Sequence, residues 1–457
     1  MDSPSPPSSS NIGPLPNTAF GFAQYRFYWT ARLASTTAST IMVVVIGAHV
    51  YDLARQTMSI ERASFWLGLV GLAQFLPLFV LTLVAGYVAD RVDRRWIVRA
   101  SLFLELGCGL SLALLAANDA VTLPALFTVS VLLGIGRAFA GPALSAFAPN
   151  LVPKALLPSA IALGSIAWQA GAVGGPLIGG LSYAVSATLA YALSAAMLGV
   201  SLLAMFCIDP LPRGDAGKSH PLRAVIDGIA YVRHNKIVLG AISLDLFAVL
   251  LGGATALLPV YARDILFVGP EGLGFLRAAP PAGAAATAIL LARFPLRRNV
   301  GITMFWCVAI FGLATVVFGA SRLMWLSMGS LVVLGAADMI SVYVRSSLIQ
   351  LHTPDAMRGR VSAVSGLFIS ASNELGEFRA GIAGAQLGPV TAVVAGGALA
   401  VLATGACAWA FPALRRADSF VVPDMETMEQ SGAMGSLPVE APAMAAGQDL
   451  QAEKGKA

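Results

Sequence analysis

The chain has 457 residues, of which 57% are hydrophobic and only 12% are charged, and its formal net charge at pH 7 is +5. A soluble domain carries about 25% charged residues, so this composition excludes an ordinary soluble protein and indicates one that crosses a membrane many times. The four cysteines lie inside apolar stretches, and the four histidines are not spaced like a ligand pair. We therefore expect no metal site, no cofactor and no disulfide framework.

The two ends of the chain differ in composition from everything between them. Residues 1–22 are rich in Ser, Pro and Asn, and residues 413–457 are acidic and rich in Ala, Gly and Met, so both are predicted to be disordered tails. The first tail has no basic region before an apolar core and is not expected to be a signal peptide. Between the tails, twelve stretches are each long and apolar enough to cross a bilayer. These stretches are 27–50, 64–89, 96–117, 123–147, 159–184, 187–208, 237–261, 273–292, 300–320, 323–349, 361–387 and 390–411.

The order of the spans predicts an all-α integral membrane fold, with twelve transmembrane helices in two six-helix bundles. The bundles are expected at 23–208 and 237–412, because a polar break at 209–236 follows the sixth span. Within this break, Ser219 can cap a helix and Pro221 suits its first turn. The apolar residues that follow recur at helical spacing, which predicts a short amphipathic helix lying on the membrane surface.

The basic residues predict the orientation of the chain. Fifteen Lys and Arg residues lie in the loops after even-numbered spans, whereas four lie in the loops after odd-numbered spans. Cytoplasmic loops carry an excess of basic residues. We therefore expect the first set of loops, and with it both tails, to be cytoplasmic.

A charged turn at 86–95 lies between the second and third spans. It places two carboxylates and three guanidinium groups within six residues, so it must lie at a membrane face. Such a cluster can hold two helices in one relative position and release them in another. The alternative is a plain basic loop that only fixes topology.

Among the ionisable residues inside the predicted spans, we single out ten. Each costs at least about 2.5–3.5 kcal/mol at mid-membrane, so they must face a bundle interior or a water-filled cavity. Arg277 and Arg345 lie near span ends and could reach the membrane surface. Arg137, Asp338 and Glu374 lie deep in their spans and are candidates either for function or for a buried structural ion pair. Asp338 and Arg345 are seven residues apart, on one helical face. The ten are Arg32, Glu105, Arg137, Asp245, Arg277, Asp338, Arg345, Glu374, Glu377 and Arg379.

The fifth span contains a stripe of small residues. Gly171, Gly175 and Gly179 recur every four residues and form one flat face, beside Pro176 and Gly180. This face allows another helix to approach closely, and the proline points to a bend. The stripe is therefore either an ordinary packing surface or a pivot for a moving half of the protein.

Three of these patterns resemble signatures of the major facilitator superfamily. The charged turn, Gly86-x-x-Ala89-Asp90-Arg91-x-x-Arg94-Arg95, resembles the signature that follows the second helix. The helix-five antiporter motif is matched at Gly171, Gly175, Pro176, Gly179 and Gly180, and Arg137-x-x-x-Gly141 resembles the helix-four motif associated with proton coupling. The chain departs from the first signature at Val88, where Leu is usual, and at Asp93, where Gly is usual. The second copy of that signature, at 293–299, keeps only its basic character.

Within this superfamily, the chain is most similar to the enterobactin exporter group of bacterial permeases. The similarity is carried by 25–33, 89–95, 258–266, 357–363 and 373–378. The resemblance implies two bundles around a central cavity, which alternate between inward-open and outward-open states. It also implies that a conformational latch is formed by Gly86, Asp90, Arg91, Arg94 and Arg95.

The function expected from this resemblance is proton-coupled efflux of a small amphipathic molecule. Arg137 would bias the protonation of a nearby acid, and that acid could be Glu105, Asp338 or Glu374. The cargo could be a catecholate siderophore such as enterobactin, and the alternative is broad multidrug or antibiotic efflux. The residues considered for the substrate cavity are Arg32, Trp168, Gln169, Asp245 and Asn373.

Other classes of function have less support in the sequence. A membrane-embedded enzyme would need a nucleophile–base pair or a metal constellation, and no HExxH or GxSxG pattern occurs. The helix-five motif disfavours a transport-inactive, receptor-like protein and a proton-coupled importer. We therefore expect a monomeric, multi-pass protein of the bacterial inner membrane that is not an enzyme. Its expected partners are a small-molecule substrate, protons and the lipid bilayer, and not nucleic acid.

Overall fold

The computed structural model describes residues 18–145, 147–210, 221–296, 298–418 and 420. These residues are helical almost throughout, and no strand occurs among them. Most of both predicted tails, and the predicted helix cap at Ser219, lie outside the described residues. The residues of the tails that are described include the short helices η1 (Ala19–Gly21) and α16 (Pro412–Arg415).

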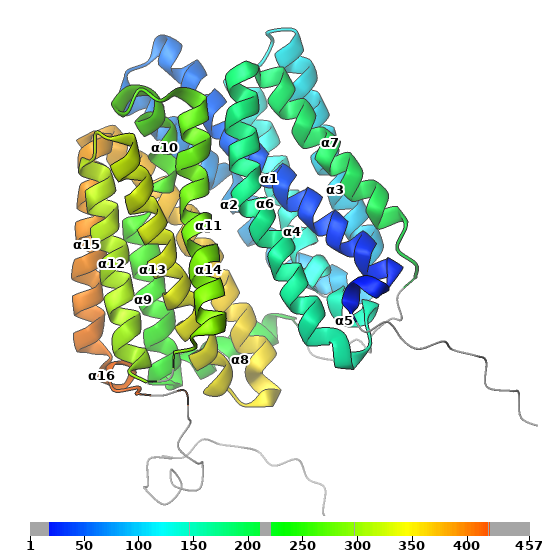
Figure 1. The fold of residues 1–457 in the computed structure, drawn as a ribbon, viewed down its shortest axis with the longest axis vertical. Helices are drawn as coiled ribbons and strands as arrows, with labels where there is room; N and C mark the ends of the chain where they lie inside the picture. Colours follow the sequence, from blue (N-terminus) through cyan, green and yellow to red (C-terminus); the bar gives the residue numbers. More distant parts are fainter. Residues whose placement is uncertain (1–17, 146, 211–220, 297, 419, 421–457) are drawn as a thin grey trace, which may run out of the picture.

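The helices form two bundles, which Figure 1 shows side by side, with α1 in blue and α15 in orange. The first bundle has six long helices and two short ones: α1 (Ala23–Thr57), α2 (Ile60–Arg91), α3 (Arg94–Ala117), α4 (Leu123–Ser145), α5 (Ala148–Leu151), η2 (Lys154–Leu156), α6 (Leu157–Val185) and α7 (Ala187–Phe206). The second comprises α9 (Lys236–Gly252), η3 (Thr255–Leu257), α10 (Leu258–Val260), η4 (Tyr261–Ile265), α11 (Gly269–Arg293), α12 (Val300–Ala320), α13 (Met324–Leu351), α14 (Asp355–Leu387) and α15 (Pro389–Ala410).

The long helices follow from long apolar runs that end at polar caps. The side chain of Ser59 accepts a hydrogen bond from the backbone of Arg62 at the start of α2, and Ser186 does the same for Leu189 in α7. Between α14 and α15 the chain turns at Gly388, whose φ of 82° favours glycine. Each predicted span therefore corresponds to a helix or, for the seventh span, to the segment from α9 to η4, which is interrupted at 253–254.

Eleven helical segments among the described residues are long and apolar enough to cross a membrane. The twelfth long helix, α14, spans 33 residues but is not among them, because Glu374, Glu377 and Arg379 join the charges at its start. The predicted count of twelve thus agrees with helix length, and α14 falls short only in apolar character. A helix that carries such charges needs polar partners inside the protein.

A separate helix, α8 (Pro221–His234), joins the bundles where an amphipathic helix was predicted. It packs against α14, where Arg360 Nη1 donates to Asp227 Oδ2 at 3.0 Å. Val232 is buried in a cluster with Val361 and Val364 of the second bundle. The linker helix is therefore docked on protein along this face.

The two bundles touch one another near one end of the molecule. We call this the α1–α2 end, since it carries residues 57–60, and the opposite end, which carries α8, the α8 end. At the α1–α2 end, α2 meets α14 at Gly68 and Gly381, and α6 meets α11 at Gly180 and Gly274. A Cβ at Gly68 would lie 2.9 Å from the Cα of Gly381, so the backbones are in direct contact. Towards the α8 end, α6 and α11 diverge (Figure 1).

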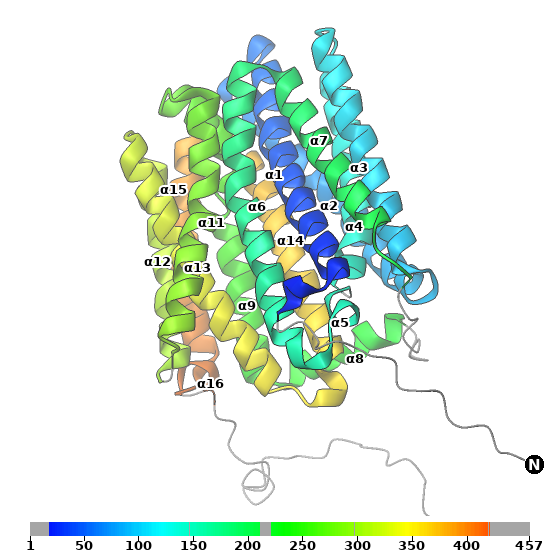
Figure 2. The same cartoon turned by 45° about the vertical axis from the view of Figure 1, so that its right-hand side comes forward.

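The packing at the α1–α2 end is also apolar. One buried cluster combines residues of both bundles, among them Val44 and Leu67 of the first and Leu257 and Leu273 of the second. Figure 2 shows α1 and α6 side by side within the first bundle, with α11 of the second next to α6. The bundles therefore share a core at this end and keep separate cores elsewhere.

Candidate functional site

A cavity of about 350 Å³ lies between the two bundles. Its lining comes from α1, α2, α4 and α6 of the first bundle and from η3, α10, α11 and α14 of the second. Most of the lining is apolar, with a small number of polar side chains. This combination is typical of small-molecule sites, and the size is in their usual range of about 300–1,000 Å³.

The first bundle contributes one polar pair to the cavity. Arg137 of α4 donates from Nη1 to Gln74 Oε1 of α2 at 2.9 Å. The two helices can approach here because Gly134 faces the backbone of Gln74 and lies close to Pro77. The pair uses only part of the hydrogen-bonding capacity of the guanidinium group, which also lines the cavity.

The second bundle contributes a cluster of three. Arg277 of α11 lies 3.5 Å from Glu377 Oε1 of α14, and it donates from Nη1 to the backbone oxygen of Thr255 at 2.8 Å. The hydroxyl group of Thr255 donates to the same Glu377 oxygen at 3.1 Å. Gly71 of α2 makes room for this carboxylate, because a Cβ there would lie 3.3 Å from Glu377 Cβ.

Glu374 lies one turn before Glu377 and lines the same cavity. It is within electrostatic reach of Glu377, Arg137 and Arg277. The cavity therefore holds two carboxylates and two guanidinium groups, drawn from three helices and from both bundles. Because the charges balance when all four are ionised, one added proton leaves a net positive charge, and this changes what the cavity attracts.

A second polar network crosses between the bundles at the α1–α2 end. Tyr51 of α1 donates to Asp264 Oδ2 at 2.5 Å, and Arg55 Nε lies 3.3 Å from the same oxygen. In the second ion pair the charges are exchanged between the bundles, since Arg263 of the second bundle pairs with Asp52 of α1. We call these five residues the cross-bundle network. Tyr183 of α6 adds a further hydrogen bond to Asp52 Oδ2, at 2.8 Å.

The cross-bundle network was not predicted from the sequence. Arg55 and Arg263 were only counted as basic residues of loops. The sequence does contain a signal for it, because the first and seventh spans end in the same Val-Tyr pair, at 50–51 and at 260–261. In both places an aspartate and an arginine follow within four residues. Residues at equivalent ends of two related halves can pair reciprocally, as they do here.

Comparison with known proteins identifies the family to which this architecture belongs. The family described as "Transmembrane secretion effector" (MFS_3) matches residues 9–434, nearly the whole chain. The chain belongs to this family. It is thus a multi-pass membrane transporter of the major facilitator superfamily, as the sequence motifs indicated.

Individual relatives agree with this assignment. The chain is 26% identical over 378 residues to "Enterobactin exporter EntS" of Shigella boydii serotype 18, an alignment that covers 82% of this chain and 88% of the relative. Among solved structures, a D-xylose-proton symporter gives a TM-score of 0.66 at 14% identity, with 85% of this chain and 97% of the other covered. A POT family transporter in complex with 5-aminolevulinic acid gives a TM-score of 0.68 at 12% sequence identity, with 85% of this chain and 96% of the other covered. Both solved structures share the fold of this chain.

The five residues considered for the substrate cavity are not among the residues that line the central cavity in this structure, so their part in substrate binding stays a prediction. Three are engaged with protein groups close by: Arg32 donates to Tyr28 Oη at 2.9 Å, Gln169 Nε2 to the backbone oxygen of Pro281 at 2.8 Å, and Asn373 Nδ2 to Ile369 at 3.0 Å. Trp168 is 52% exposed, and Asp245 is buried beside Arg345. Sequence position could not show which helical face looks inward.

The candidate proton acids separate into different places. Glu374 lines the central cavity, whereas Glu105 is buried in the first bundle against Gly136, within electrostatic reach of Arg137. Asp338 lies inside the second bundle, in a different small cavity. The suggestion that Arg277 and Arg345 reach the membrane surface is wrong, because Arg277 lines the central cavity and Arg345 is buried.

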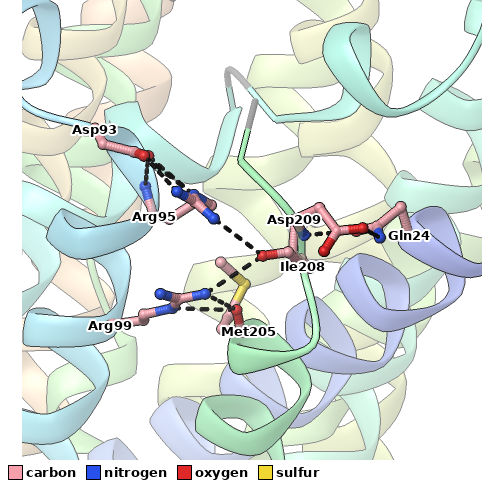
Figure 3. Close-up of polar contacts among 7 residues, drawn as sticks. All are labelled: Gln24, Asp93, Arg95, Arg99, Met205, Ile208 and Asp209. Atoms are coloured by element: carbon pink, nitrogen blue, oxygen red, sulfur yellow. Dashed lines mark hydrogen bonds and ion pairs between the residues drawn. The ribbon is translucent and has the colours of Figure 1, made fainter. Parts of the chain in front are cut away.

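The superfamily's charged turn follows α2 at the end opposite to residues 57–60, and Figure 3 shows the contacts of its side chains with the end of α7. Asp93 caps α3 and pairs with Arg95 at 2.7 Å, and this hydrogen-bonded pairing holds the pKa of Asp93 below its usual value. Arg95 also donates to the backbone oxygen of Ile208, 3.3 Å away, and Arg99 donates to that of Met205 at 2.9 Å.

These contacts join α3 to the end of α7 within the first bundle. Arg95 therefore makes its contacts inside one bundle in this structure, and the Asp93 that replaces the usual glycine is its partner. Arg94 is partly buried at the first position of α3. The backbone of Gly86, Asp90 and Arg91 belongs to α2, but their side chains lie outside the described residues. The latch remains a prediction.

The antiporter motif is a packing face. Gly171, Gly175 and Gly179 all face α1, where a Cβ would contact Thr36, Thr40 and Ile41, respectively. Thr40 donates a hydrogen bond to the backbone oxygen of Gly171 at 3.0 Å. Gly180 turns instead to Gly274 of α11, and Pro176 reaches the central cavity. The stripe thus joins helices within one bundle and ends at the contact between the bundles.

Proposed function

We propose that this transporter exports a small amphipathic molecule across the bacterial inner membrane in exchange for protons. The observation that carries the proposal is the central cavity, which holds two carboxylates and two guanidinium groups between the bundles. The excess of Lys and Arg in the even-numbered loops supports a cytoplasmic α8 end and cytoplasmic termini. In that orientation the cross-bundle network closes the outer side, and the cavity belongs to an inward-facing state.

Glu374 is our choice for the carboxylate that carries the coupling proton. It lies among Glu377, Arg137 and Arg277, so its charge state decides the net charge of the cavity. While Glu374 is ionised, its carboxylate can accept hydrogen bonds from the hydroxyl groups of a substrate. Protonation removes the negative charge, weakens these hydrogen bonds and releases the substrate. The proton and the substrate would thus occupy the cavity in turn, and alternation between the inward-open and outward-open states would carry them in opposite directions.

The substrate class rests on the relatives. Their name, enterobactin exporter, supports a catecholate siderophore as the cargo of this chain. The cavity offers what such a molecule needs, namely apolar walls for aromatic rings and the guanidinium groups of Arg137 and Arg277 for its oxygen atoms. The alternative is broad multidrug efflux, in which the same walls accept unrelated lipophilic molecules.

Everted inner-membrane vesicles with an imposed pH gradient would test the proposal. Labelled, iron-free catecholate siderophore should accumulate and be lost when the gradient is collapsed. Accumulation of a lipophilic dye alone would favour the multidrug alternative. If neither moves in response to the gradient, the exchange mechanism is wrong and a transport-inactive protein has to be considered.

The variant E374Q should lose at least about tenfold of the gradient-driven accumulation, because an amide keeps the shape of the side chain but cannot carry a proton. D227N is the matched control, since Asp227 pairs with Arg360 at the α8 end, away from the cavity. Normal gradient-driven transport by E374Q would remove Glu374 from the mechanism.

A further inference from the structure

A second group of ionisable residues lies inside the second bundle, apart from the central cavity. Asp245 of α9 and Arg345 of α13 form an ion pair and are only 6% and 3% exposed. Asp338, two helical turns before Arg345 on the same face of α13, lines a small cavity together with Asp245. With both carboxylates ionised, these three residues carry a net charge of −1 inside a membrane-spanning bundle, which is unfavourable unless a cation joins them.

A small cavity of about 10 Å³ lies at this group. Its polar lining consists of Asp245, Asp338 and Ser341, and the remaining walls are apolar. A volume of about 10–15 Å³ on this scale is what a single water molecule needs, and a water also needs two to four polar partners. The cavity therefore fits one water molecule and nothing larger.

The hydroxyl group of Ser341 gives an independent indication of a ligand. Ser341 is only 2% exposed and lines the cavity, yet its Oγ has no hydrogen-bond partner among the described residues. Serine side chains inside helices usually bond to the backbone one turn earlier, as Ser330 of the same helix does. An unsatisfied buried hydroxyl group is destabilising, so a partner in the cavity is favoured.

The surroundings limit which charged groups can act on Asp338. From α9 the facing titratable group is Asp245, and from α12 the cavity is lined by Val308 and Phe311, neither of which titrates. The helices α11 and α14 also pack on α13, but none of their described residues lines the cavity. Arg345, on α13 itself, is engaged by Asp245.

We propose that Asp338 binds a proton in this cavity, where one water molecule links its carboxyl group to the hydroxyl group of Ser341. The added proton brings the group of Asp245, Asp338 and Arg345 to zero net charge. A metal cation would find only three oxygen-bearing side chains here, and one of them, Asp245, is already paired with Arg345. The site is thus a second proton-binding carboxylate, held within one bundle, while Glu374 lies between the two. Proton binding by Asp338 does not depend on the proposed function; only a role of this site in transport rests on the proposed exchange of protons for substrate.

Infrared difference spectroscopy of the purified full-length protein between acidic and alkaline pH would test this site. The C=O stretching band of a protonated carboxyl group should be present in the unaltered protein and absent in D338N. In S341A the band should remain but shift, because its hydrogen-bond partner has changed. In E374Q it should be unchanged, so a failure of the central-cavity mechanism would not remove it.

Two further measurements keep the result interpretable. D338E retains a carboxyl group and should show a displaced band, which guards against a D338N variant that merely folds badly. Replacement of choline chloride by sodium chloride should leave the band unchanged. The proposal is overturned if D338N and the unaltered protein give the same spectrum, or if sodium ions abolish the band, since the site would then bind a metal cation.

Discussion

At the scale of single residues, the charge on Asp93 has a defined structural task. Its carboxylate caps α3 and accepts hydrogen bonds from the guanidinium group of Arg95, which in turn reaches the end of α7 (Figure 3). Because this pairing lowers the pKa of Asp93 in the folded state, the stabilisation is present above the unfolded-state pKa of about 3.9. It is lost as the pH falls through the lower, folded-state value.

We therefore expect D93N to be less stable than the unaltered protein by about 1 kcal/mol at neutral pH. The asparagine can still cap the helix, so the difference reports the charge. The melting temperature of detergent-solubilised protein should show a gap between the two proteins at pH 7 that shrinks below about pH 4. A gap that stays the same at acidic pH would mean that packing, and not ionisation, is responsible.

At the scale of helices, the glycine stripe of α6 sets how closely α1 can approach. Gly175 faces Thr40 and the backbone oxygen of Thr37, which a Cβ would approach to 2.7 Å. Its neighbour Gly174 has no atom within 4 Å of the Cβ position. The two glycines lie in the same helix and have the same intrinsic preference, so they form a matched pair.

G175A should lower the free energy of unfolding by about 1–3 kcal/mol, because the added methyl group forces the two helices apart. G174A should be neutral or stabilising by up to about 1 kcal/mol, since alanine favours a helix over glycine. Thermal unfolding of both variants in the same detergent would check this. Equal effects of the two substitutions would show that α1 and α6 do not pack in this register.

The helices were predictable because each span is a long apolar run, which can be recognised from consecutive residues alone. The packing role of Gly171, Gly175 and Gly179 could also be read from their spacing. The partners of charged side chains could not, because they depend on how helices from distant parts of the chain are rotated. Arg277 meets Glu377 and Arg345 meets Asp245 across about 100 residues of sequence, and no local pattern encodes such pairs.

At the scale of the whole molecule, the two bundles are held together at one end by a shared apolar cluster, by glycine contacts and by the cross-bundle network. Each charged pair of this network joins the bundles, and the four charged residues in it are only partly removed from water. Individual pairs of this kind contribute little stability. They can nevertheless shift a balance between two states of similar free energy, since about 1.4 kcal/mol changes the ratio tenfold.

The variant D264N should weaken closure of the α1–α2 end, because Asp264 accepts hydrogen bonds from both Tyr51 and Arg55. A loss of about 1–2 kcal/mol would raise the population open at this end by roughly 5–30-fold. The readout is labelling of V44C by a membrane-impermeant maleimide added outside intact cells, since Val44 is buried and lines the central cavity. The four native cysteines would first be replaced by serine or alanine.

Two controls decide what the labelling means. D227N removes an ion pair at the α8 end and should not raise labelling from outside, because that pair does not join the bundles. The charge exchange D52R with R263D should restore slow labelling relative to either single variant, since it rebuilds a pair of opposite charges at the same place. Labelling that is equally fast in D264N and in the unaltered protein would show that the apolar cluster and the glycine contacts hold this end closed without the network.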